Sequence, residues 1–293
     1  MTDFLDGSPA VINVDGFTFN QLDDDGVKWT LDKVSGWHDG PSVKVEQEQR
    51  IVSHGQFAQP GHRGGRTITM SGMLMAHTRG PLAAATQRLA TILGDGGFGT
   101  FEFIDADHIT LWTPVQLLQT PDMSWDGDPL TVRYQLSFVA PSAYRFGAIS
   151  SGSTDFAATP SGVGLVFPPF DAGVIDFGAS ADVGQVAVTN YGTASAPVVF
   201  TITGPTPTNG FVITDTVTGK RIQYLGQVPD GSTLVIDCGA GSVIIDGTAD
   251  RLGDTIVTEW VTLPAGETRA FLFEPNGATT SSTLTAEVTS TYW

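Results

Sequence analysis

The segment 80-GPLAAATQRLATILGDGG-97 has a pattern that sets it apart from the rest of this 293-residue chain. Its apolar residues follow one another at steps of three, four, three and one, which places them on one helical face: Leu82, Ala85, Leu89, Ile92 and Leu93. Pro81 fits the first turn of a helix, and Gly94 fits the position just past its end. We therefore expect one helix over residues 81–93.

The segments on both sides of this helix are typical of β-strands. Residues 66–76, RTITMSGMLMA, alternate apolar and polar positions before it, and residues 99–104, GTFEFI, begin a similar pattern after it. Asp-Gly pairs mark tight turns between such segments. The 35 Gly, the 17 Pro and the low share of charged residues, 15%, agree with a β protein that has many tight connections. The sequence therefore predicts a mainly β protein with one helix.

A change of composition near the middle of the chain indicates two domains. Residues 148–185 are small, polar and rich in Gly and Pro, and they contain no Lys or Arg. We expect residues 1–148 to form a β-sandwich or sheet domain that carries the helix. We expect residues 149–293 to form a second, all-β sandwich of jelly-roll type, with a linker and leading strands over 149–185. Its strand patterns recur roughly every ten residues.

The charge and the single cysteine exclude several classes of protein. The formal net charge is −17, and both halves are acidic, which disfavours ordinary binding to nucleic acid. One cysteine, Cys238, allows no intrachain disulfide and suits a reducing compartment. The start of the chain lacks a signal-peptide pattern, and no apolar run reaches 18 residues. We expect a soluble protein that folds in a cytoplasm and does not enter a membrane.

The short motifs that resemble ligand sites each have a simpler interpretation. Gly94, Gly96 and Gly99 form a literal G-x-G-x-x-G, but the motif closes a helix instead of opening one, which favours a turn. Residues 23–25 with Gly26 resemble part of a calcium loop but lack its ligand spacing. The five His form no zinc pattern, and no G-x-S-x-G is present. We therefore expect no catalytic site, no metal and no cofactor.

The order of these segments resembles the distal tail proteins of phages with long non-contractile tails, especially the minor tail proteins of phages of actinobacteria. DGFTFNQLDDDGVKWTLDKVSGW (15–37) is similar to the opening hairpin of that family, and RTITMSGMLMAHTRGPLAAATQRLATIL (66–93) to its strand-then-helix unit. LTVRYQLSFVAPSAYRFG (130–147) is similar to the closing strand of the first domain. The second half, from VAVTNYGTASAPVVFTITGP (186–205) to WVTLPAGETRAFLFEP (260–275), is similar to the family's outer, galectin-like sandwich.

This resemblance implies a structural role in the virion. The chain would form a ring, usually a homohexamer, at the distal end of the tail, after assembly in the host cytoplasm. Its first domain would make the ring and stack on the tail tube protein. Its second domain would point outward to tail-tip components, a tail-associated lysin or receptor-binding proteins. DNA would pass through the central channel without specific binding.

The residues suggest how such a ring could work. A closed ring needs two different, complementary surfaces on each copy, and we expect strands over 41–52 and 66–76 to supply them. A channel for DNA should repel phosphates, so we expect carboxylates to line it, with Asp23, Asp24 and Asp25 as candidates.

An alternative function remains open for the second domain. Trp260 and Tyr224 are candidates for stacking against a sugar ring, because aromatic side chains offer large apolar faces. On this alternative the chain is a carbohydrate-binding adhesin that contacts host cell-wall glycan through its C-terminal sandwich, and the first domain is its mount.

Overall fold

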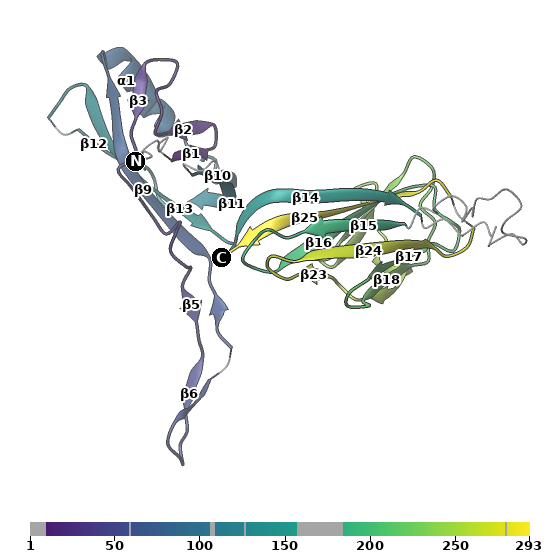
Figure 1. Ribbon diagram of the computed structural model, residues 1–293. Helices are drawn as coiled ribbons and strands as arrows, with labels where there is room; N and C mark the ends of the chain where they lie inside the picture. The colour runs from purple at the N-terminus through teal and green to yellow at the C-terminus, as the bar shows by residue number, and fades with distance from the viewer. Residues whose placement is uncertain (1–9, 59, 106–108, 126, 157–183, 279) are drawn as a thin grey trace, which may run out of the picture. The chain divides into compact units, whose positions relative to one another are not determined.

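The computed structural model describes residues 10–293, apart from 59, 106–108, 126, 157–183 and 279. The chain forms two compact units: Met1–Gly147 with Tyr292–Trp293, and Ala148–Thr291. Both units are built from β-strands, and the one α-helix within the described residues lies in the first (Figure 1). The expectation of a mainly β protein is confirmed.

One group of strands in the first unit is short and antiparallel. Its order is β2–β1–β10–β11, and its strands are β1 (Val11–Val14), β2 (Phe17–Phe19), β10 (Gly99–Ile104) and β11 (Thr110–Leu117). Asp15 and Gly16 connect the first two strands with φ of 48° and 77°, which is the geometry that favours an Asp-Gly pair in a two-residue hairpin turn. Phe101 on β10 is fully buried, so this sheet turns one face to the core.

The long strand β9 (Arg66–Ala76) is the centre of the second group of strands. Its partners are β13 (Thr131–Ala140) on one side and β3 (Val27–Trp29) and β4 (Lys33–Ser35) on the other, while β12 (Asp122–Trp125) pairs with β13. Gly72 lies where β3 gives way to β4. A Cβ there would lie 2.0 Å from the carbonyl oxygen of Thr30, so only glycine allows the two backbones to approach this closely.

The helix α1 (Arg79–Leu89) packs on the β9 group and covers part of the core. Its buried side chains come from the expected apolar face: Leu82, Ala85 and Leu89. It begins two residues before the expected start at residue 81 and ends four residues before the expected end at residue 93. The chain then continues in turns whose amides bond three residues back, as from Ile92 to Leu89 (3.2 Å) and from Gly94 to Thr91 (3.0 Å). Leu93, and not Gly94, takes positive φ (45°).

The second unit is a sandwich of two sheets. One sheet has the order β14–β25–β16–β19–β20–β21, with strands Arg145–Asp155, Thr283–Tyr292, Ala196–Thr203, Thr233–Asp237, Ser242–Ile245 and Ala249–Asp250. The other has the order β15–β24–β17–β18–β22, with strands Gln185–Thr189, Thr268–Pro275, Phe211–Asp215, Arg221–Tyr224 and Thr255–Thr258. The short β23 (Thr262–Leu263) pairs with β16, and a single 3-10 turn, η1 (Leu252–Asp254), precedes β22.

The core of this unit is formed by alternate residues of strands in both sheets. Phe200 of β16 meets Phe271 of β24 edge to face, with ring centroids 5.0 Å apart. Phe273 of β24 stacks on Phe156 at 4.0 Å. Residues 149–155, at the start of the region where we expected a linker and leading strands, lie in β14, and residues 157–183 of that region lie outside the described residues.

Candidate assembly surfaces

The most unusual feature of the first unit is a two-stranded arm, which we define as residues 41–65. It leaves the body of the unit between β4 and β9 (Figure 1). Two short ladders hold it together: β5 (Val43–Lys44) with β8 (His62–Arg63), and β6 (Gln47–Gln49) with β7 (Gln56–Ala58). Nearly all of its described residues are exposed. A hairpin with so little paired backbone and no covering layer is marginally stable in water, so the arm is a surface that gains from a partner.

The tip of the arm carries apolar side chains with no cover from the chain. Ile51 is 98% exposed and Val52 is 95% exposed. Beside them Phe57 is 59% exposed, and the guanidinium of Arg50 lies 4.8 Å from the centre of its ring. Adjacent, fully exposed aliphatic residues on a projecting element are typical of a contact surface.

The charge of the arm also differs from that of the whole chain. Residues 41–65 contain three cations, Lys44, Arg50 and Arg63, against two carboxylates, Glu46 and Glu48, whereas the whole chain has a net charge of −17. A neutral to weakly basic arm on an acidic protein can approach a second copy without the repulsion that two acidic surfaces would meet.

The second expected ring strand, 66–76, is paired on both sides over most of its length. It coincides with β9, which pairs with β13 along ten residues on one side and with β3 and β4 on the other. Edge-to-edge pairing of this strand with a neighbouring copy is therefore disfavoured, because most of its backbone is already paired within the unit, and its part in a ring stays a prediction. Its apolar side chains belong to the core instead.

The three candidate channel residues, Asp23, Asp24 and Asp25, lie together in the turn before β3, beside α1. Asp23 accepts hydrogen bonds from the backbone N of Val27 (2.8 Å), from Nε1 of Trp29 (2.9 Å) and from Nη2 of Arg88 (3.0 Å). Burial alone would raise the pKa of Asp23, but the hydrogen bonds from Trp29, Val27 and Arg88 outweigh it and hold that pKa below its usual value.

The neighbours of Asp23 are more accessible. Asp24 and Asp25 are exposed, and Oδ2 of Asp25 lies 3.7 Å from Nη1 of Arg88. The turn borders an open hollow of about 780 Å³ that Leu22 and Arg88 also line. Arg88 therefore offsets part of this negative charge, and Asp23 serves first to fix the turn, the indole of Trp29 and the helix.

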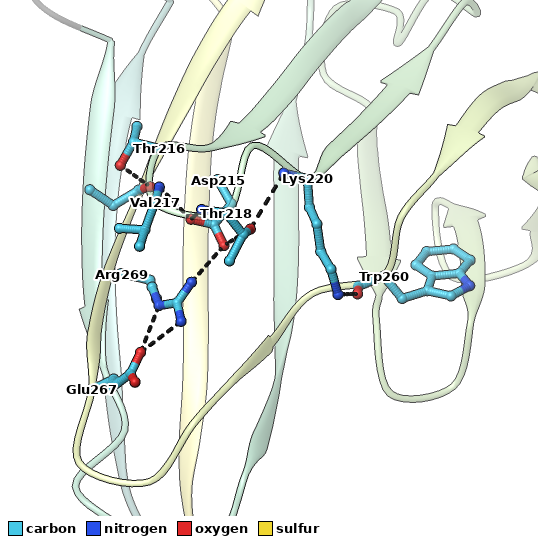
Figure 2. Close-up of polar contacts among 9 residues, drawn as sticks. Asp215, Thr216, Val217, Thr218, Lys220, Trp260, Glu267 and Arg269 are labelled. Carbon is cyan, nitrogen blue, oxygen red and sulfur yellow. Dashed lines mark hydrogen bonds and ion pairs between the residues drawn. The ribbon is translucent and has the colours of Figure 1, made fainter.

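In the second unit, Figure 2 shows a polar network at the turn between β17 and β18. Asp215, only 1% exposed, accepts hydrogen bonds from the backbone of Val217 (2.9 Å), from Oγ1 of Thr218 (2.6 Å) and from Nη1 of Arg269 (3.1 Å). Arg269 also binds Glu267, with 2.7 Å between Nη2 and Oε2. Burial would raise the pKa of Asp215, but the hydrogen bonds from Thr218 and Val217 and the charge of Arg269 outweigh it and lower that pKa. These groups satisfy one another, so the network stabilises the turn.

The two candidate sugar-stacking residues do not form an exposed pair. Tyr224 is 1% exposed and packs in the core against Phe211, with ring centroids 5.4 Å apart, so its ring offers no face to a ligand. Trp260 is partly buried against the same core, and its carbonyl oxygen accepts a hydrogen bond from Nζ of Lys220 at 3.4 Å (Figure 2). The alternation of β18 explains the outcome, because Ile222 and Tyr224 point inward together.

The described residues contain no group of three or more His, Cys, Asp or Glu side chains placed to hold a metal ion. Across the same residues, no helix has the length and apolar character needed to cross a membrane.

Comparisons with known proteins agree with a role in assembly. Residues 191–292 match the family model described as the C-terminal domain of the siphovirus-type tail component. The chain is similar to the solved structure of SPP1 Dit (gp 19.1), described as a paradigm of hub adsorption apparatus in phages that infect Gram-positive hosts. Their identity is 11% and their TM-score is 0.66, with 97% of this chain and 100% of that chain covered.

A second solved structure gives the same result. The chain is similar to a chain of the phage P2 baseplate in its activated conformation with Ca, with 9% identity, a TM-score of 0.51, and coverage of 95% of this chain and 98% of that one. No curated protein matches the sequence. At these identities the solved structures show a shared fold, and the family match covers most of the second unit. Together they confirm the resemblance to distal tail proteins of long-tailed phages; the narrower likeness to phages of actinobacteria stays a prediction.

Proposed function

We propose that this chain is a structural subunit of the hub at the distal end of a phage tail, where copies of it close into a ring. The observation that carries this proposal is the arm, which places exposed Ile51 and Val52 at the end of a projecting hairpin. The similarity to a protein described as a paradigm of hub adsorption apparatus, and to a chain of a phage baseplate, supports it. No catalytic site takes part in this function.

The ring forms when the arm of one copy binds the body of the next. This contact joins two different surfaces, so it is heterologous. It closes a ring when a whole number of copies completes one full turn. Burial of the arm tip would stabilise this contact by about 25 cal/mol for each Å² of apolar surface removed from water. Strand β9 is disfavoured as part of this contact, since both of its edges are paired over most of their length. Six copies is the ring size that the family resemblance implies.

The remaining assignments rest on the family resemblance. The first unit stacks on the tail tube protein, and the second contacts tail-tip components, a tail-associated lysin or receptor-binding proteins. The subunits assemble in the host cytoplasm and end at the distal tip of the virion's tail.

The channel of the ring lets DNA pass without binding it. Asp24 and Asp25 suit its lining because both are exposed, whereas Asp23 is largely engaged by Trp29 and Arg88. A neutral or basic lumen in a structure of the ring would contradict this placement.

The adhesin alternative receives less support from the described residues. Tyr224 is buried, and Trp260 has only part of its indole exposed, so no aromatic platform is formed by the pair. Measurable glycan affinity that is lost in Trp260→Ala would revive it.

The proposal is tested with the double variant Ile51→Asp, Val52→Asp. Light scattering of the wild-type chain should give a mass of about 185 kDa, six times 30.9 kDa, and negative-stain images should show rings with a central hole. The double variant should remain at 30.9 kDa over the same concentrations. Its free energy of unfolding should change by less than about 0.5 kcal/mol, because both side chains are exposed in the single chain.

The matched control is the double variant Ile149→Asp, Ile256→Asp, which adds the same two negative charges at residues 63% and 58% exposed in the second unit. It should form rings like the wild type. Rings of unchanged mass and concentration dependence in the double variant would show that the arm does not join the copies.

A further inference from the structure

The arm is attached to the body of the first unit through a buried arginine. Arg66, the first residue of β9, is 2% exposed, and its Nη1 donates to the carbonyl oxygens of Gly36 (2.9 Å), Trp37 (2.8 Å) and Asp39. Its Nη2 donates to the carbonyl oxygen of Ala143 at 3.3 Å. Burial and the positive charges of two further arginines lower the pKa of Arg66 to about 10. The segment that precedes the arm is thus tied to the start of β9.

This attachment fixes where the arm begins but not the direction in which it points. The ladder at the root joins only two residue pairs, Val43 with Arg63 and Lys44 with His62. Gly64 and Gly65 separate that ladder from β9, and one further backbone hydrogen bond, from N of Gly64 to the carbonyl oxygen of Ser42 (2.8 Å), joins the two sides of the arm there. A direction set by so few bonds would fluctuate unless side chains restrain it.

Such a restraint is present at the root of the arm, and it comes from a residue distant in sequence. The indole of Trp293 lies between two partners: the guanidinium of Arg63 is 4.3 Å from the centre of its ring, and the ring of Tyr144 is 4.6 Å from it, centroid to centroid. Arg145 donates a hydrogen bond to the carbonyl oxygen of Trp293, and its guanidinium lies 5.5 Å over the ring of Trp37. Trp293 is 37% exposed, so more than half of its surface is covered.

We infer that Trp293, Arg63 and Tyr144 form a clamp that fixes the direction of the arm before a neighbouring copy binds it. Arg63 is the end of the arm that the clamp holds, and Tyr144 with Arg145 anchors Trp293 to the body of the first unit. A restrained arm loses less conformational freedom when it docks, so the clamp favours ring closure. The purpose of the clamp, though not its existence, rests on the ring proposed above.

The position of Trp293 in the chain gives the clamp a second consequence. Trp293 follows β25 directly, 230 residues after Arg63, and all the strands of the second unit precede it. A chain cut before this residue keeps the entire arm but loses the restraint on its direction. The clamp therefore makes an assembly-ready arm depend on completion of the second unit, and it disfavours entry of truncated chains into a ring.

The clamp is tested by the spread of distances between the arm tip and the helix within a single chain. The native thiol is removed with Cys238→Ala, and spin labels are attached at Ser53→Cys in the arm and Ala90→Cys just after α1, both exposed positions of the first unit. Distances are measured by pulsed electron–electron double resonance on the full chain, at concentrations below those at which rings form. We expect one narrow distance distribution for Trp293 and a distribution at least twofold broader for Trp293→Ala.

Three further variants make the result specific. Arg63→Gln should broaden the distribution as Trp293→Ala does, because it removes the cation from the indole, whereas Trp293→Phe should keep it narrow, because a phenyl ring still stacks on Tyr144. Trp125→Ala, at an indole 51% exposed on β12, should leave the width unchanged. Equal widths for the wild type, Trp293→Ala and Arg63→Gln would overturn the clamp. The distances are measured in single chains, so they test the clamp whether or not rings form. Light scattering tests the rings separately, and the failure of one proposal is therefore distinguishable from the failure of the other.

Discussion

The arm of the first unit and the turn between β17 and β18 of the second unit both connect strands, yet they differ in how their groups are satisfied. The turn is short, and Asp215 binds its backbone, Thr218 and Arg269 within hydrogen-bond distance. The arm extends for 25 residues and leaves Ile51 and Val52 in water. The first connection is complete within one chain, whereas the second leaves apolar side chains that, on the proposed function, a neighbouring copy covers. The difference indicates which part of the surface is built for assembly.

The largest effect on stability is expected where the chain satisfies itself. Asp215→Ala would leave Arg269, whose side chain is 10% exposed, without its buried partner, and the turn amides without their acceptor. We expect the free energy of unfolding of the second unit to fall by about 3–5 kcal/mol, measured by urea denaturation. The control is Asp230→Ala at an exposed position, which should change it by less than about 0.5 kcal/mol. A loss below about 1 kcal/mol in Asp215→Ala would remove the contrast with the arm.

The carboxylate of Asp215 also determines how the stability of the second unit changes at low pH. The pKa of Asp215 is lower in the folded chain than its unfolded value of 3.8, so its contribution is fully present above pH 3.8. That contribution is lost as the pH falls from 3.8 through the lower folded pKa, where the unfolded chain binds the proton more readily. Asp215→Ala should therefore flatten the dependence of stability on pH in that range, when unfolding is followed at a series of acid pH values.

A smaller effect is expected at Asp23, which resembles the second-unit turn more than it resembles the arm. Asp23→Ala would leave Nε1 of the buried Trp29 without its acceptor and would release Arg88. We expect a loss of about 1–3 kcal/mol in the unfolding of the first unit. Asp24→Ala, at the exposed neighbouring residue, is the matched control and should be nearly neutral. If both variants proved neutral, Asp23 would act only as a surface charge, and the turn before β3 would not resemble the turn between β17 and β18.

The sequence predicted the elements whose pattern is local. The spacing of Leu82, Ala85 and Leu89 located the helix, because a 3.6-residue period is visible within one segment. The end of the helix was placed too late, since Ile92 and Leu93 are buried in the turns that follow it and so continue the apolar pattern. The inward position of Tyr224 could have been inferred from its alternation with Ile222.

Other features could not be predicted, because they depend on contacts between distant residues. The alternation around Val43 and Val45 predicted strands, but such a pattern does not say whether a body exists for them to cover. In the structure these strands cover no core, and they form the exposed arm. The role of Arg66 depends on carbonyl groups at residues 36–39 and 143, and that of Trp293 on Arg63 and Tyr144. The adjacent Ile51 and Val52, which break the alternation just before a glycine-containing turn, were the available signal for the arm tip.

The most direct test of this account is photo-crosslinking from the arm tip in assembled rings. A photoreactive amino acid replaces Val52, and rings are assembled from an equal mixture of isotopically heavy and light chains. The account predicts that crosslinks between a heavy and a light chain form as often as crosslinks between chains of the same label, and that they run from the arm tip to the first unit of the neighbouring copy. Rings whose crosslinks from residue 52 are confined within single chains would contradict the claim that the arm joins the copies.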